Sequence, residues 1–392
     1  MKKRRFVSLI MAAVMVGSIF APTGVFAETK AQKKIETKAL ASDERITVSD
    51  EEQLKDAIEQ AQTGVQTEIQ LTSDVELTES LEIPQEKDII LSGDSAQRKL
   101  TLTKRITGAA GSETLAVIMV TGTLALKNLV VDANSYARIM TVQSGGEVTL
   151  ESGAVLQNGK LGTTTSNYGA GINLKDGSAK KTTLLTINSG TKITGCTVAG
   201  EARIRGVAIA AGRYTTITMN GGNIENNTDL CTGVSGKYSL GGGIYLNGAQ
   251  SQLIMKDGAI ANNTAKGGGG GIYVDASASC ELTGGVISNN KAATNGGGAY
   301  VLGEMKLSGA KISENTVESS KRTAGSACGG GIYIADWDNS QTGSARNYGT
   351  VYMTGGSIEK NQVISTVESN DNQISIGQGG GIYLSLIHIF RG

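Results

Sequence analysis

Three glycines followed by an aliphatic residue and a tyrosine recur along the second half of the chain, beginning at residues 241, 269, 296, 329 and 379. The copies are therefore separated by 28, 27, 33 and 50 residues. Self-similarity on this scale is typical of repeat folds, in which each unit packs only on its neighbours. The wider spacings indicate loops inserted between strands of a unit, since surface insertions cost little free energy.

A second phrase lies inside each unit and repeats in strict columns. It begins at Ile217, Leu253, Cys280, Met305 and Val351, and an earlier copy begins at Val148. Apolar residues two positions apart point to one face of a strand. The phrase ends in a column of asparagines, which we expect to form a buried ladder of amides, with metal or glycan ligation as the alternative. The ladder comprises Asn158, Asn227, Asn263, Asn290, Asn315 and Asn361.

One short helix is predicted before the repeats, over about residues 49–62. Ser49 or Asp50 can cap it, and the apolar residues from Leu54 to Ala61 recur at helical spacing before Gly64 ends it. After Gly64 the apolar residues alternate with polar ones in short strands, and no second helical pattern follows.

These phrases resemble the right-handed parallel β-helix of the pectin-lyase-like superfamily and, more narrowly, the GGGIY repeats of adhesin-like surface proteins of Gram-positive bacteria. The resemblance covers roughly residues 46–384 and is clearest over 217–384. It implies an all-β fold, a right-handed parallel β-helix (β-solenoid) with a short N-terminal capping helix. The motif is specific for the fold and unspecific for activity.

The N-terminus has the pattern of an export signal. A basic start, an apolar run over residues 6–20 and small residues up to Ala27 predict a signal peptide over residues 1–27. The alternative is an uncleaved membrane anchor. Residues 28–45 are charged and aperiodic, as in a linker. We expect no membrane span after signal cleavage and a secreted or cell-surface protein, and the resemblance implies a Gram-positive cell wall.

The C-terminal phrase SLIHIFRG, residues 385–392, interrupts the fifth repeat and contains the single histidine, His388. Its composition differs from that of the repeats. We interpret residues 385–392 as a non-native tail on a C-terminally truncated fragment. A genuine apolar C-terminal strand is the alternative.

Aromatic residues supply the candidate glycan contacts. Tyr245, Tyr273, Tyr300 and Tyr333 each follow a glycine run, and strand alternation predicts that they face away from the core as an external row. Such a row can be a structural stack or a platform for sugar rings, and an inward stack is a third possibility. The single tryptophan, Trp337, lies in a long insertion between two aspartates, and is either a sugar platform or a plug over the coil edge.

The four cysteines do not suggest a disulfide framework. Cys280 occupies a core column, Cys196 falls where the ladder has asparagine, and Cys231 and Cys328 lie in variable loops. Those two loops are about three coils apart, farther than a disulfide can reach. We therefore expect no essential disulfide.

The net charge and the absence of certain motifs argue against several classes of function. With 36 basic and 36 acidic residues the formal net charge is zero, which argues against nucleic-acid binding. The Asn-Thr-Asp phrase at 227–229 is not accompanied by an adjacent aspartate pair, and the glycine runs lack the P-loop pattern.

We expect no catalytic site, cofactor or metal, and an adhesin-like or glycan-binding structural stalk whose partner is a polysaccharide or a host or cell-wall glycan. The alternative is a divergent polysaccharide lyase or glycoside hydrolase of the same superfamily, acting on acidic plant or host polysaccharides, so enzymatic activity stays open.

Overall fold

The computed structural model describes residues 45–105, 116–163, 167–200, 204–231, 239–319, 327–337, 347–365 and 377–385. All of them belong to one compact unit, Arg45–Gly392. The predicted signal peptide (1–27), the linker (28–45, apart from Arg45) and the tail (385–392, apart from Ser385) lie outside the described residues.

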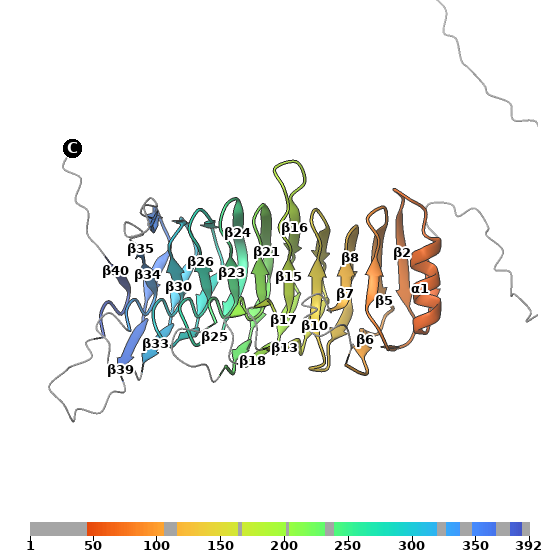
Figure 1. Cartoon of the computed structure of the whole chain (residues 1–392), viewed down its shortest axis with the longest axis horizontal. Coiled ribbons are helices and arrows are strands. Elements are labelled where there is room, and N and C mark those ends of the chain that lie inside the picture. Colours follow the sequence, from red (N-terminus) through yellow and green to blue (C-terminus); the bar gives the residue numbers. More distant parts are fainter. Residues whose placement is uncertain are drawn as a thin grey trace, which may run out of the picture. The chain divides into compact units, whose positions relative to one another are not determined.

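The described unit is a stack of coils in which equivalent strands pair in parallel (Figure 1). Each complete coil contributes strands to four rows, and a corner separates the first row from the second. The first two rows form one 19-stranded sheet and the fourth row forms a 10-stranded sheet, counted over the described residues. The predicted all-β fold, a parallel β-helix with one short helix, is therefore confirmed.

The strands of each row follow one another at coil intervals. The first row contains β1 (Ile46–Val48), β2 (Gln66–Leu71), β5 (Asp88–Gly93), β8 (Thr123–Lys127), β11 (Glu147–Leu150), β16 (Thr183–Ile187), β21 (Thr215–Glu225), β24 (Ser251–Ala261), β27 (Ser279–Leu282), β31 (Glu304–Leu307) and β37 (Thr350–Met353). The second row contains β3 (Val75–Leu77), β6 (Arg98–Leu102), β9 (Leu129–Asp132), β12 (Val155–Gln157), β17 (Lys192–Thr194), the second halves of β21 and β24, β28 (Val286–Ser288), β32 (Lys311–Ser313) and β38 (Ser357–Glu359).

The two remaining rows close each coil. The third row contains β13 (Lys160–Thr163), β18 (Thr197–Gly200), β22 (Thr228–Asp229), β25 (Thr264–Ala265), β29 (Lys291–Ala292), β33 (Thr316–Ser319) and β39 (Gln362–Ser365). The fourth row contains β4 (Leu81–Ile83), β7 (Ala116–Val120), β10 (Arg138–Val142), β15 (Ile172–Leu174), β20 (Ile209–Ala211), β23 (Ile244–Leu246), β26 (Ile272–Val274), β30 (Ala299–Val301), β34 (Ile332–Ile334) and β40 (Ile382–Leu384). Two small pairs stand outside the rows: β14 (Asn167–Tyr168) with β19 (Ile204–Arg205), and β35 (Asp336–Trp337) with β36 (Asn347–Tyr348).

Columns of apolar side chains fill the inside of the coils. Leu253 pairs in register with Ile217 in the coil before it and with Cys280 in the coil after it. All three side chains are at most 1% exposed. Full burial of such a side chain contributes roughly 1.5–3 kcal/mol, so register and core formation support each other.

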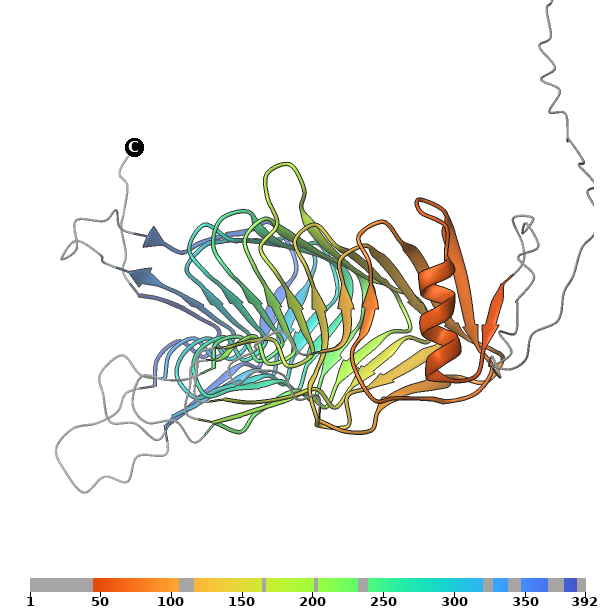
Figure 2. The same ribbon diagram turned by 45° about the vertical axis from the view of Figure 1, so that its right-hand side comes forward.

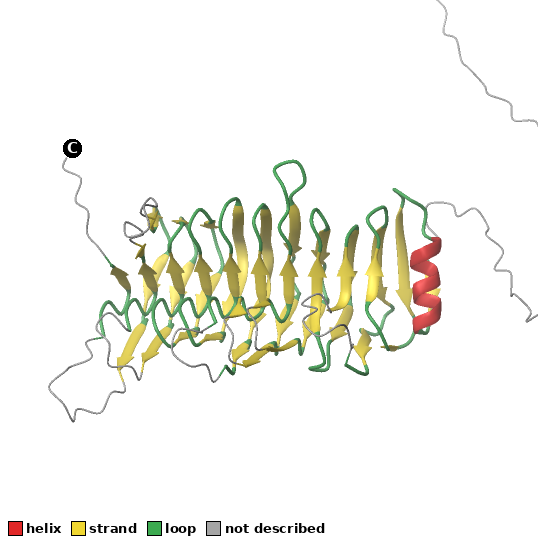
Figure 3. Cartoon of the chain, in the orientation of Figure 1, coloured by secondary structure: helices red, strands yellow, loops and turns green. Residues whose placement is uncertain are grey.

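The helix α1 (Glu51–Gln60) covers the N-terminal end of the stack and lies across the first coil (Figures 2 and 3). Asp50 caps it, because its carboxylate accepts a hydrogen bond of 2.8 Å from the backbone N–H of Gln53. The helix buries Leu54, Ala57 and Ile58 against the end of the core. It ends at Gln60 rather than near residue 62, since Ala61 leaves the helical conformation (ψ 138°).

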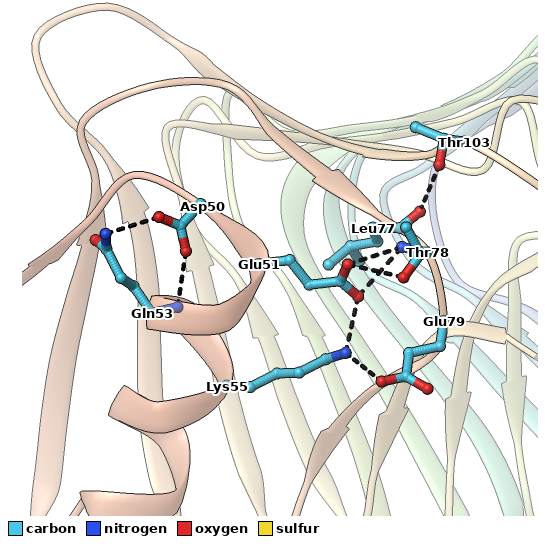
Figure 4. A network of polar contacts seen from close by, with 8 residues as sticks. All are labelled: Asp50, Glu51, Gln53, Lys55, Leu77, Thr78, Glu79 and Thr103. Carbon is cyan, nitrogen blue, oxygen red and sulfur yellow. Dashed lines mark hydrogen bonds and ion pairs between the residues drawn. The ribbon is translucent and has the colours of Figure 1, made fainter. Parts of the chain in front are cut away.

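A polar network fastens α1 to the turn between β3 and β4 (Figure 4). The Glu51 carboxylate accepts hydrogen bonds from the Thr78 hydroxyl at 2.9 Å, the Thr78 backbone N–H at 3.1 Å and Lys55 Nζ at 2.8 Å. Lys55 also forms an ion pair with Glu79. Burial alone would raise the pKa of Glu51, but the Lys55 and Thr78 bonds outweigh burial and lower that pKa.

Candidate functional site

The asparagine column forms a continuous ladder inside the second turn of the coils. Asn263 donates from its backbone N–H (3.0 Å) and from Nδ2 (3.1 Å) to Asn290 Oδ1 in the next coil. Its Nδ2 also donates to the Ile224 carbonyl at 2.9 Å, while its own Oδ1 accepts two bonds from Asn227. The same pattern continues through Asn290, Asn315 and Asn361.

This ladder uses the hydrogen-bonding capacity of its amides. An asparagine amide has two N–H donors and one oxygen with two lone pairs, and Asn263 uses all of them within the protein. The side chains of Asn227, Asn263, Asn290 and Asn315 are fully buried. The column therefore stabilises the stack, and Asn263, Asn290 and Asn315 have no donor or acceptor left for a metal ion or a glycan.

Asn158 was expected in this ladder, and that expectation is wrong. Strand pairing aligns Gln157 with Thr194 and Thr194 with Glu225, which places Asn158 in the same column as Asn226, two coils away and one residue before the ladder position. Asn158 and Asn226 share a left-handed backbone, with φ values of 59° and 58°. The side chain of Asn158 instead donates to Asp132 Oδ1 at 3.0 Å.

The corner between the first two rows explains this shift. Val148 and Leu156 are eight positions apart, whereas their counterparts Ile217 and Ile224 are seven apart. Because of the additional corner residue, each residue after the corner aligns with the residue one position earlier in the repeat phrase. The ladder position next to Asn227 is therefore held by Cys196, whose backbone N–H donates to Asn227 Oδ1 at 3.0 Å.

The tyrosines form a stacked row on the fourth row of strands. Ring centroids are 5.2 Å apart for Tyr245 and Tyr273, 4.5 Å for Tyr273 and Tyr300, 4.9 Å for Tyr300 and Tyr333, and 5.5 Å for Tyr333 and Tyr383. Their strand neighbours, such as Ile244, belong to the apolar core, so the rings lie on the opposite face of the strands, as expected.

The expected exposure of this row is wrong for its first members. Tyr245 is 2% and Tyr273 is 5% exposed, while Tyr300 and Tyr333 are half-buried. Strand alternation identifies the face on which a side chain lies but does not identify what covers that face. Because Tyr273 has a tyrosine ring on each side, neither of its faces can stack on a sugar ring.

Polar partners hold the N-terminal end of the row. The Tyr245 hydroxyl donates to Asp275 at 2.5 Å, and the Arg205 guanidinium lies 5.9 Å from the Tyr245 ring centroid and 5.3 Å from that of Tyr168. Burial, followed by the Asp275 charge, raises the pKa of Tyr245. The row is thus a neutral structural stack over the described residues.

Trp337 lies in β35, which pairs antiparallel with β36. In this hairpin Trp337 is opposite Asn347, and Asp336 is opposite Tyr348, which is 46% exposed. The side chain of Trp337 and the neighbours Asp338 and Arg346 lie outside the described residues. Its role as a glycan contact stays a prediction.

The glycine runs serve turns and close contacts between neighbouring coils. Gly269 has a left-handed backbone (φ 71°), which suits glycine at a turn. Gly270 needs the absence of a side chain for a different reason, since a Cβ there would lie 2.4 Å from the Gly297 carbonyl oxygen of the next coil. Gly271 has a similar contact with Gly298 at 2.6 Å.

The carboxylate of the Asn-Thr-Asp phrase is also used structurally. Asp229 is 3% exposed. It accepts hydrogen bonds from the backbone N–H of Cys231 at 2.7 Å and of Lys266 at 2.8 Å, and from the Ser239 hydroxyl. These bonds close a turn and connect neighbouring coils.

All four cysteines are buried and carry free thiols. Cys280 packs in its core column, and Cys231 and Cys328, although expected in variable loops, are buried as well. Burial raises the pKa of Cys196 to about 12, as it does for Cys231.

One concave site was missed by sequence reasoning. A groove of about 480 Å³ opens beside the turn between β15 and β16. Its lining combines hydroxyl and amide side chains with one tyrosine: Ala179, Thr182, Tyr214, Thr216, Gln250, Gln252 and Ser279. The only sequence signal was the longer polar stretch between the two strands, residues 175–182. A second and larger concavity, of about 670 Å³, lies beside α1 and is lined mainly by charged and hydroxyl side chains, such as those of Glu51, Lys55 and Thr78.

Within the described ranges, no group of three or more histidine, cysteine, aspartate or glutamate side chains is placed to hold a metal ion. No helix among the same residues is long and apolar enough to cross a membrane. Comparison of the chain with models of protein families, with curated proteins and with solved structures found no match in any of the three.

Proposed function

We propose that this protein is a secreted or cell-surface β-helix of the pectin-lyase-like superfamily that acts as an adhesin-like or glycan-binding structural stalk in a Gram-positive cell wall. One observation carries the proposal. The polar and aromatic residues that recur from coil to coil contact their counterparts in the next coil: Asn263 is hydrogen-bonded to Asn290, and the ring of Tyr273 stacks on that of Tyr300.

Side chains used in this way stabilise a stack rather than contact a substrate. Amide hydrogen bonds and ring stacking join each coil to the next, and each added coil extends the same contacts. Such a repeat is suited to be a rigid spacer. The accessible polar groove described above supports the glycan-binding part of the proposal. In such a protein, ligands are bound by loops and grooves that differ from the repeat.

The test is to separate binding from cleavage with the whole secreted chain. The protein is passed over immobilised neutral and acidic polysaccharides and over isolated cell walls, and the retained fraction is measured together with reducing ends and unsaturated sugars in the liquid. We expect retention without cleavage products. Protein that has been unfolded in urea is the control for retention by an unfolded chain.

Release of reducing ends or unsaturated sugars would favour a divergent polysaccharide lyase or glycoside hydrolase acting on acidic polysaccharides, and would refute the stalk. Absence of retention on every polysaccharide and on the cell walls would refute glycan binding. Antibody labelling of intact source cells tests the location, and labelling that requires lysis would contradict a surface protein.

A further inference from the structure

The turn between β15 and β16 departs from the repeat. It projects beyond the corresponding turns of the neighbouring coils (Figure 1). Ser178 and Lys181 exchange backbone hydrogen bonds of 2.8 and 3.1 Å, so the projecting segment is a tight hairpin. This hairpin forms one wall of the groove, through Ala179 and Thr182.

Contacts with two neighbouring coils hold the hairpin in place. On one side, Asp176 accepts from the Arg213 backbone N–H at 2.8 Å and pairs with the Arg213 guanidinium at 2.9 Å, while the Gly177 N–H donates to the Arg213 carbonyl at 2.8 Å. On the other side, the aliphatic part of Lys181 covers Gly145, where a Cβ would lie 2.3 Å from Lys181 Cδ. The groove is therefore formed before any ligand arrives, which lowers the entropic cost of binding.

The floor and the opposite wall of the groove come from successive coils. Thr216 pairs with Gln252, and Gln252 pairs with Ser279, so their side chains lie on one outward column. Tyr214 precedes this column in a left-handed conformation (φ 54°). Its backbone N–H donates to Ala249 and its carbonyl accepts from Thr183, each at 3.1 Å, which fixes the position of the residue.

The chemistry of the lining selects among ligands. The lining residues carry no charge, so an acidic ligand would lose hydration inside the groove without a cationic partner among them. A purely apolar ligand would leave the Gln250, Gln252 and Thr216 groups without hydrogen-bond partners. A neutral sugar has an apolar ring face for a tyrosine and hydroxyls for amides, and the groove volume lies within the usual range of ligand sites.

We propose that this groove binds a neutral saccharide, with the Tyr214 ring against a sugar face and with Gln250, Gln252 and Ser279 bonded to sugar hydroxyls. The proposal rests on the glycan-binding function proposed above and specifies its ligand class as neutral rather than uronic. It also places recognition outside the tyrosine row and outside Trp337.

The experiment is calorimetric or array-based titration of the whole chain with neutral oligosaccharides (gluco-, galacto-, manno- and N-acetylglucosamine oligomers) and with uronic acid oligomers. Tyr214→Asn removes the ring but tolerates the left-handed backbone, and Gln252→Ala removes one amide. Each variant should weaken neutral-sugar binding roughly tenfold, as loss of a central contact does. Thr218→Ala, on the same outward face but outside the groove, is the matched control and should bind like the unchanged protein. Equal unfolding midpoints show that the variants are folded.

The outcomes separate the two proposals. If the unchanged chain binds neutral sugars and both groove variants bind equally well, or if uronic oligomers bind more tightly, the groove proposal is overturned while glycan binding stands. If the unchanged chain binds none of the sugars, the groove and the glycan-binding function fall together.

Discussion

Single residues in the asparagine turn differ sharply in role although they are adjacent. Asn262 is exposed and has a left-handed backbone (φ 55°), whereas Asn263 is fully buried and bonded on every side. The first position accepts several residue types, since Glu314 and Lys360 occupy it in later coils. The second position depends on an amide, because only an amide continues the ladder in both directions.

The substitution Asn263→Ala tests this dependence. It leaves the Asn227 amide without its acceptor and the Ile224 carbonyl without its donor, both buried. Buried unsatisfied groups of this kind destabilise a protein by about 3 kcal/mol together. We expect a clear fall in the urea concentration at the midpoint of unfolding, measured by far-ultraviolet circular dichroism. Asn262→Gly is the matched control and should leave the midpoint nearly unchanged, because glycine suits a left-handed backbone. Equal midpoints for the two variants would contradict the ladder as a source of stability.

The columns around these residues could be predicted from the sequence, but two details could not. Asn158 stands ten positions after Val148, the same spacing as Asn227 after Ile217, and spacing alone cannot show that one residue more lies in the corner. Likewise the alternation around Tyr245 predicts its face correctly but not its burial. The first error concerns the length of a corner and the second concerns what covers a face of the sheet, and the pattern of a single strand carries information on neither.

At the scale of elements, the helix α1 was predictable and its attachment was not. Its cap and apolar stripe are local patterns, and both are present as expected. The bonds from Thr78 to Glu51 join residues 27 positions apart, a separation that no local pattern reveals. The groove could not be predicted from a local pattern either, since its lining comes from three coils and a polar insertion.

The attachment of the helix should depend on pH. Since the folded-state pKa of Glu51 lies below its ordinary value of 4.5, the stabilisation is present above that value and is lost as the pH falls through the folded-state pKa. Glu51→Gln should lower the free energy of unfolding near neutral pH by about 1–2 kcal/mol, because it removes hydrogen bonds to a charged group. The difference should shrink as the pH falls through the folded-state pKa, below which the carboxylate of the unchanged protein is protonated.

The exposed neighbour Glu52 supplies the control. Glu52→Gln changes the same charge in the same first turn of the helix, so the two variants share any effect on the helix dipole. Thermal unfolding of both variants at each pH isolates the contribution of the Thr78 and Lys55 contacts. A pH-independent deficit in Glu51→Gln would contradict an electrostatic attachment.

At the scale of the whole molecule, the described part of residues 45–392 is a one-dimensional stack, in which each coil contacts the coils before and after it. In such proteins stability is approximately a sum of unit and interface contributions, so damage stays local. This property separates a solenoid from a globular domain, in which a core substitution weakens every element.

Leu253→Ala tests this locality. It removes a fully buried side chain from β24, a change that costs roughly 2–5 kcal/mol. Native-state amide exchange should accelerate in β21, β24 and β27, while β2 and β5 keep their protection. Ile254→Ala, on the outward face of the same strand, should change exchange far less. Uniform acceleration from β2 to β34 would contradict a stack of separable coils.

The in-register pairing has a consequence for how such a protein changes in length. A duplication of one repeat would insert a complete coil whose asparagine, tyrosine and core residues meet residues of the same kind above and below, as Asn263 and Asn290 already meet each other. The part beyond the insertion is carried outward by about 4.8 Å without being rebuilt. Gain or loss of whole repeats would therefore set the reach of the stack in steps of one strand spacing.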